Sequence, residues 1–231
     1  MKDKILIACS KNWFIKNKFV KIFLKKNKSK FIIISKKKDL NLSNLNKINP
    51  KIIFFPNWSH IVSEKIIIKY NCICFHTSPL PYGRGGSPIQ NHILKKFKKS
   101  PVCAIRMTKK IDSGPIYLKR NISLLGNLDE IFDRISLKIV EMIKILLKKK
   151  INPKKQKGKI FVFKRIKENQ SEIKKNDNLN FIYDKIRMLS SENYPHAFIK
   201  NRNLKIYLTR PIIKKKQIFC EAKVEKIEKK Y

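Results

Sequence analysis

Glycine, cysteine and acidic residues are all scarce in this chain of 231 amino acids. The five cysteines form no Cys-x-x-Cys pair, which argues against a disulfide framework and against a zinc site, so we expect no metal. No apolar run reaches the roughly 18 residues that a membrane span needs. The first ten residues hold only a short apolar run, with no secretory signal. These absences predict a cytoplasmic protein with reduced thiols and no membrane partner.

The scarcity of acidic residues leaves the chain strongly basic. There are 55 Lys and Arg against 16 Asp and Glu, which gives a formal net charge of +39. Such a charge suits a polyanionic partner such as RNA, because phosphates attract Lys and Arg. A composition bias would give the same count, since the chain is also rich in Asn and Ile and its lysines are spread along its length. The charge alone leaves both interpretations open.

The few glycines and prolines are concentrated in residues 72–116. Glycine permits positive φ and close approach of a ligand, whereas proline stiffens a loop. An apolar run, residues 72–75, leads to His76 at the start of this loop, and a second Gly-Pro turn carries Asp112. Open α/β sheets present reactive side chains at the carboxyl ends of strands. His76 and Asp112 are therefore a candidate acid–base pair, with a purely structural histidine as the competing interpretation.

Short apolar runs alternate with amphipathic segments through the first 150 residues. We expect strands at 4–10, 31–35, 52–56, 72–75, 102–107 and 116–118, and helices at 12–26, 88–97 and 128–147, with Ser63 and Ser87 as candidate caps. The near-continuous Ile run of the second strand is typical of a parallel strand covered on both faces. The pattern predicts an α/β fold, a Rossmann-like open and mostly parallel sheet with helices on both faces.

The pattern changes beyond residue 147. We expect a strand at 160–163, a helix at 179–189, and strands at 197–199, 204–208 and 218–224 that include a hairpin. This region reads as a small C-terminal α+β appendage. We therefore divide the chain into a large domain (1–150), a basic linker (151–159) and a small α+β domain (160–231).

Two blocks of sequence contain a distinctive set of residues in a fixed order: His76, Ser78, Leu80, Pro81, Arg84, Gly85, Pro88, Ile89, Gln90, Asp112 and Gly114. These blocks resemble the formyltransferases that use 10-formyltetrahydrofolate, a family that includes methionyl-tRNA, glycinamide ribonucleotide and sugar N-formyltransferases. The family pattern is Asn-x-His, Ser-x-Leu-Pro, Arg-Gly, Pro-Ile and, later, Leu-Asp-x-Gly, and these residues fit it in order, with Ile111 in place of the leucine. The resemblance covers roughly residues 4–147 and makes residues 1–150 the expected catalytic domain.

The resemblance implies a role for each part of the site. His76 would stabilise the oxyanion that forms when an amine attacks the formyl carbon, and Asp112 would orient His76 and favour its protonated form. The expected folate contacts are Ser78, Pro79, Leu80 and Pro81, with Trp58 and Ile61 beside the pterin ring. Packing of Trp58 against the next helix is the alternative. The expected acceptor contacts are Arg84, Gly85, Gly86 and Asn91.

One position departs from the family pattern: Cys74 stands where the catalytic asparagine is expected. A thiol is a weak hydrogen-bond donor and a poor replacement for an amide. Either Asn91, Asn57 or His60 supplies the missing donor, or the acceptor chemistry is altered, or the enzyme is weakened.

The leading hypothesis is an N-formyltransferase that acts on a small primary amine, first a nucleotide-linked amino sugar, with 10-formyltetrahydrofolate as co-substrate. It rests on a C-terminal region too short for the family's full tRNA-binding barrel. The basic charge supports an alternative, a methionyl-tRNA formyltransferase or a shortened relative with tRNA as partner. Cys74 supports a second, a non-catalytic folate- or RNA-binding relative. A homodimer is a further candidate assembly.

Overall fold

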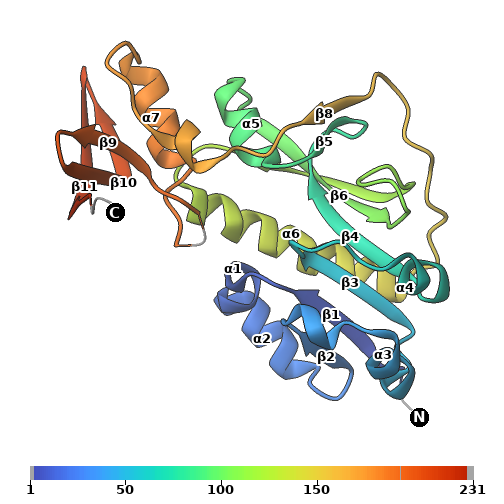
Figure 1. The fold of residues 1–231 in the computed structure, drawn as a ribbon. Coiled ribbons are helices and arrows are strands. Elements are labelled where there is room, and N and C mark those ends of the chain that lie inside the picture. Colours follow the sequence, from blue (N-terminus) through green and yellow to red (C-terminus); the bar gives the residue numbers. More distant parts are fainter. Residues whose placement is uncertain (1–2, 193, 228–231) are drawn as a thin grey trace.

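The computed structural model describes residues 3–192 and 194–227 (Figure 1). A six-stranded sheet with the order β2-β1-β3-β4-β6-β7 lies at its centre. Its strands are β1 (Ile5–Cys9), β2 (Phe31–Ile34), β3 (Ile52–Asn57), β4 (Cys72–Thr77), β6 (Lys99–Arg106) and β7 (Ile116–Ser123). β6 runs in the direction opposite to that of the other five strands, so the predicted mostly parallel sheet is confirmed.

Helices cover both faces of this sheet. One face carries α1 (Asn12–Lys16), α2 (Lys18–Lys26), α5 (Pro88–Leu94) and α6 (Leu128–Lys148), and the other carries α3 (Leu42–Ile48) and α4 (Glu64–Lys69). Successive side chains of a strand point to opposite faces. In β1, Ile5 and Ile7 therefore enter the first core while Leu6 and Ala8 enter the second. This double burial explains why the parallel strands read as unbroken apolar runs.

The long helix α6 packs against the sheet and contributes many residues to the larger core. Its 21 residues bury a stripe that includes Ile131, Ile135, Ile139 and Ile143, which recur every four positions. That spacing places them on one side of a helix with 3.6 residues per turn. Asp129 and Glu130 lie in the first turn, where the helix dipole favours negative charge.

Three helix details differ from the sequence-based expectation. The segment 12–26 forms two helices, because the side chain of Asn17 accepts hydrogen bonds from the backbone N–H of Phe19 and Val20 and so starts a new helix. Ser63 and Ser87 stand at helix N-caps, but neither side chain caps its helix. The hydroxyl of Ser87 instead accepts from the N–H of Ile166, 79 residues further along the chain.

The C-terminal region contains β8 (Phe161–Phe163), a short 3-10 helix (Glu168–Ser171), α7 (Leu179–Arg187) and a three-stranded antiparallel sheet of β9 (Ala197–Asn201), β10 (Leu204–Lys214) and β11 (Gln217–Lys226). Another 3-10 helix (Lys37–Asp39) lies between β2 and α3. The predicted hairpin joins β9 to β10. β8 leaves this region and pairs in parallel with β5 (Tyr82–Gly85). In Figure 1 the chain runs from α6 along the edge of the large sheet to reach β8. The three-part division of the chain stays a prediction.

Within the described part of the chain, no helix combines the length and apolarity that crossing a membrane requires. Nor do the described side chains include a cluster of three or more His, Cys, Asp or Glu that would hold a metal ion.

Candidate active site

A cavity of about 650 Å³ lies at the carboxyl ends of β3 and β4. One side is lined by the end of β3 and the loop after it (55–62), the end of β4 (74–77), the β5–α5 connection with the first turn of α5 (85–90) and the turn after β6. The opposite side is formed by residues of α1 and α6 and by a C-terminal segment that includes Tyr194. This is the edge at which open α/β sheets bind ligands.

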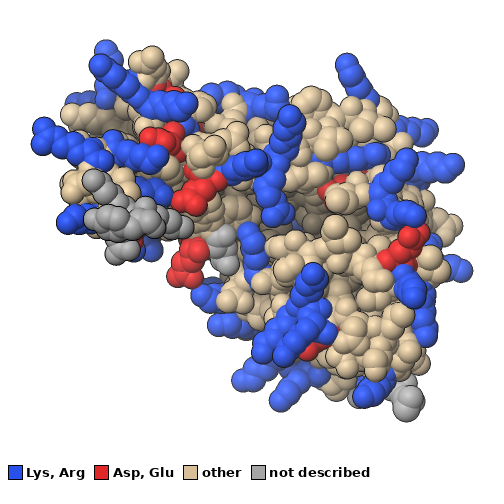
Figure 2. All heavy atoms as spheres, viewed as in Figure 1, with Lys and Arg blue, Asp and Glu red and all other residues tan. Residues whose placement is uncertain are grey.

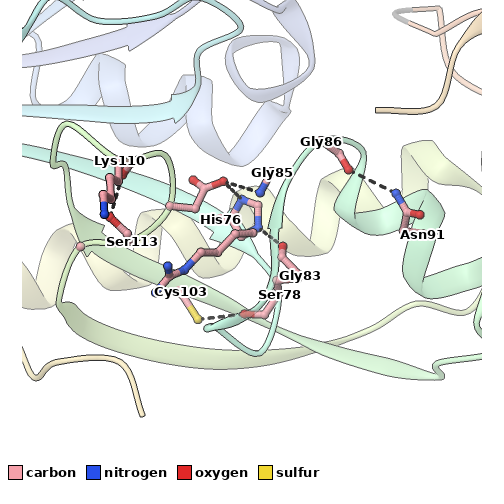
Figure 3. Close-up of polar contacts among 12 residues, drawn as sticks. His76, Ser78, Gly83, Gly85, Gly86, Asn91, Cys103, Lys110 and Ser113 are labelled. Atoms are coloured by element: carbon pink, nitrogen blue, oxygen red, sulfur yellow. Dashed lines mark hydrogen bonds and ion pairs between the residues drawn. The ribbon is translucent and has the colours of Figure 1, made fainter. Parts of the chain in front are cut away.

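His76 and Asp112 lie together in the wall of this cavity. Nδ1 of His76 is 3.4 Å from Oδ2 of Asp112, and both side chains are largely buried. Nε2 of His76 is 2.7 Å from the carbonyl oxygen of Gly83 (Figure 3). Because a carbonyl only accepts hydrogen bonds, Nε2 carries a hydrogen. Both ring nitrogens have a partner, so the imidazole is held in one orientation.

The carboxylate of Asp112 is itself fixed by the backbone. The N–H of Gly85 donates to the same Oδ2 at 2.9 Å, so this one oxygen joins the histidine to the glycine-rich loop. Asp112 has a φ of 51°, in the left-handed region that non-glycine residues rarely adopt. At Gly114 a Cβ atom would lie 1.7 Å from the carbonyl oxygen of Arg106, so only glycine fits this turn. The Asp-x-Gly spacing therefore has a steric cause.

The expected folate contacts fall into two groups. Trp58 and Ile61 line the cavity, whereas the residues of the Ser-x-Leu-Pro loop (78–81) do not. Ser78 is fully buried there. Its hydroxyl lies 3.3 Å from Nε2 of His92, and its carbonyl accepts from the thiol of Cys103. Folate binding by either group stays a prediction.

The expected acceptor contacts also divide. Gly85 and Gly86 line the cavity, but Arg84 and Asn91 do not. The guanidinium of Arg84 donates twice to Oε1 of Gln156, from Nε at 3.1 Å and from Nη2 at 2.8 Å. The amide of Asn91 donates to three backbone carbonyl oxygens, those of residues 86, 87 and 164. Both side chains are thus engaged within the protein.

Cys74 lines the same cavity as His76 and Asp112. Burial, with a smaller contribution from the Asp112 carboxylate, raises the pKa of its thiol well above the usual range. The side chain is therefore a neutral thiol and a weak donor. Of the three alternative donors predicted from the sequence, Asn57 and His60 line the cavity and Asn91 does not.

The lining of the cavity has the chemistry to hold a flat heteroaromatic ring. Phe55, Trp58, Ile61 and Val62 supply an apolar wall. The indole N–H of Trp58 is buried and has no hydrogen-bond partner among the described residues, so a polar ligand atom could accept from it. These residues fit a pterin ring with hydrogen-bonding edges.

The sequence did not indicate the aromatic residues on the opposite side of the cavity. Trp13 stacks on Phe132 with ring centroids 4.5 Å apart, and the ring centroid of Tyr194 lies 5.8 Å from that of Phe132. The apolar pattern of segment 12–26 predicted Trp13 to be a core residue of an amphipathic helix, and that pattern does not distinguish a cavity residue from a core residue. The contact to Tyr194 joins residues too distant in sequence for a local pattern to reveal.

Comparison with known proteins gives a consistent result. Residues 168–225 match the family model "Methionyl-tRNA formyltransferase, C-terminal domain". The solved structure of methionyl-tRNA formyltransferase from Clostridium thermocellum is 41% identical, with 97% of this chain and 99% of that chain covered and a TM-score of 0.92. Methionyl-tRNA formyltransferase of Thermotoga neapolitana is 28% identical over 177 residues, 71% of this chain and 55% of that protein. The chain spans little more than half the length of this curated relative.

The sugar-specific interpretation gains no comparable support. A sugar N-formyltransferase from a Shewanella species covers 93% of this chain with a TM-score of 0.69, but at 15% identity it shows the fold alone. The short C-terminal region does not favour a sugar enzyme either, because the Clostridium thermocellum chain has nearly the same extent. High identity over nearly the whole of both chains shows that this protein belongs to the formyltransferase family.

Proposed function

We propose that this protein transfers a formyl group from 10-formyltetrahydrofolate to the amino group of methionyl-tRNA. The observation that carries the proposal is the buried His76–Asp112 pair, which opens onto a cavity in a chain 41% identical to a methionyl-tRNA formyltransferase. It replaces the preference for an amino-sugar acceptor, which rested on the length of the C-terminal region. The small-amine acceptor and the homodimer stay untested predictions.

In the proposed reaction the amine nitrogen attacks the formyl carbon. A new C–N bond forms, the C–N bond to the folate breaks, and the proton lost by the amine goes to the folate nitrogen that leaves. On this proposal, Nε2–H of His76 donates a hydrogen bond to the developing oxyanion. In the structure the same hydrogen is donated to the carbonyl of Gly83. Asp112 holds the ring and balances positive charge on it, because its carboxylate faces Nδ1.

Cys74 is assigned the place of the family's catalytic amide. A neutral thiol stabilises an oxyanion less well than an amide N–H does. Asn57 and His60 also line the cavity and are the candidates for a replacement donor. On this proposal the enzyme is active but slower than a variant with an amide at position 74.

A basic surface supports tRNA as the acceptor. In Figure 2, Lys and Arg side chains are scattered across the visible face between areas of other residues, and acidic side chains form only a few small groups. The excess is 55 basic to 16 acidic residues. Binding a polyanion by such a surface releases counterions, so the affinity falls steeply with salt.

The test is a direct acceptor comparison. Purified protein is incubated with 10-formyltetrahydrofolate and either methionyl-tRNA or a panel of nucleotide-linked amino sugars, and formylated products are identified by mass spectrometry. We expect formylmethionyl-tRNA and no formylated sugar, with the product lost in His76→Ala. A formylated amino sugar without formylmethionyl-tRNA would overturn the proposal.

A further inference from the structure

The segment predicted to be a linker (151–159) runs past the active site, and the chain is held by backbone hydrogen bonds before and after it passes. Lys154 pairs with Ile116 at the start of β7 through two backbone hydrogen bonds of 2.8 and 2.9 Å. A few residues later β8 pairs with β5, whose last residue is Gly85. Residues 154–163 therefore cross from the strand that follows the Asp112 turn to the strand that follows His76. We call these residues the strap.

Gln156, in this strap, uses its entire side-chain amide. Oε1 accepts two hydrogen bonds from Arg84, and Nε2 donates to the carbonyl oxygens of Asp112 at 2.7 Å and Gly114 at 2.8 Å. A glutamine amide offers two donor hydrogens and one oxygen with two lone pairs, so all four are satisfied. The four bonds join the loop that contains Gly85 to the turn that contains Asp112.

We propose that Gln156 is a positioning residue for the catalytic carboxylate. Asp112 adopts a left-handed backbone conformation, which persists only where the surroundings fix it. Gln156 fixes the carbonyls at residues 112 and 114, and Arg84 fixes Gln156 in turn. Oδ2 is thereby held between Nδ1 of His76 and the N–H of Gly85. The consequence for catalysis rests on the proposed formyl transfer; the positional claim does not.

The kinetic test uses Gln156→Glu. This variant keeps an acceptor for Arg84 but replaces the two donor hydrogens with an oxygen that repels the carbonyls of residues 112 and 114. We expect kcat to fall by about 10- to 100-fold, as for a small misplacement of a catalytic group, with KM for both substrates unchanged. In an Asp112→Ala background Gln156→Glu should have no further effect. The matched control is Asn152→Asp, the same chemical change at an exposed residue next to the strap.

A second readout needs no activity. Amide hydrogen exchange at Gly85 reports whether the Asp112 carboxylate is in place, since that N–H donates to Oδ2. We expect exchange at Gly85 to accelerate about tenfold in Gln156→Glu, with the amides of the central sheet unchanged. Gln156→Met, which removes all four hydrogen bonds at similar side-chain length, serves as a second variant if the first does not fold.

The outcomes separate the two proposals. Wild-type protein without formyl transfer, but with faster exchange at Gly85 in the variants, would refute the proposed function and leave Gln156 as the residue that places Asp112. Unchanged exchange at Gly85 would overturn the positional claim. A raised KM with constant kcat, or an additive effect in the Asp112→Ala background, would instead assign Gln156 to substrate binding or to general stability.

Discussion

Replacing Asp112 with asparagine tests the proposed catalytic role of the His76–Asp112 pair without changing the shape of the side chain. The carboxylate oxygen lies 3.4 Å from Nδ1 of His76. At an effective dielectric constant of about 20, unit charges at that separation attract by about 5 kcal/mol. The amide oxygen of asparagine can still accept from the N–H of Gly85, so the turn should survive while the charge is lost.

Only the part of that attraction that is gained between the ground state and the transition state changes kcat. If about 3 kcal/mol of it does, kcat falls roughly 100-fold, since each 1.36 kcal/mol corresponds to a factor of ten. KM for methionyl-tRNA should stay unchanged, because the carboxylate contacts the histidine and not the acceptor. The assay is the initial rate of formylmethionyl-tRNA formation at saturating substrates, with the melting temperature as a check on folding. An Asp112→Asn enzyme that keeps a third or more of the wild-type kcat would show that the charge of Asp112 does not contribute to catalysis.

Three further predictions concern the cavity and the buried polar groups. Cys74→Asn should raise kcat for formyl transfer, by up to about 100-fold if the amide becomes an oxyanion donor, and an unchanged or lower kcat would count against the role of position 74. Burial lowers the pKa of His92 to about 4 from 6.5. Between pH 6.5 and 4 the unfolded chain therefore binds a proton at His92 that the folded chain does not bind. This contribution should lower the free energy of unfolding by about 1.4 kcal/mol for each pH unit below 6.5. Denaturant titrations of wild type and His92→Phe at several pH values should show this loss only in wild type. Arg187 is buried and donates to Asp184 and to the carbonyl of Leu124. Arg187→Met should lower the free energy of unfolding by about 3 kcal/mol, and a change below about 1 kcal/mol in urea unfolding would show that these bonds are not needed.

The sheet could be predicted because its strands are buried on both faces and so appear as unbroken apolar runs. The break of the first helix could not, because it depends on Asn17 capping α2 rather than continuing a helix. Asparagine is an ordinary helix residue by propensity, and its use as a cap is decided by local backbone geometry.

Part of the site followed from the sequence and part did not. The order and spacing of the motifs predicted that His76 and Asp112 form a pair, and the structure places them in contact. The same motifs assigned Arg84 to the acceptor, whereas its guanidinium contacts Gln156, 72 residues further along the chain. Gln156 lies in a basic segment without apolar periodicity, so no pattern indicated that this segment packs against the active site.

The most direct measurement of the central claim is a single-turnover reaction. Excess protein is mixed with 10-formyltetrahydrofolate and a limiting amount of methionyl-tRNA, and the fraction formylated is followed in time for wild type and for His76→Ala. We expect complete formylation by wild type and a rate at least about 100-fold lower in the variant. Formylation at equal rates by both proteins, or by neither under conditions where a known methionyl-tRNA formyltransferase is active, would contradict this claim.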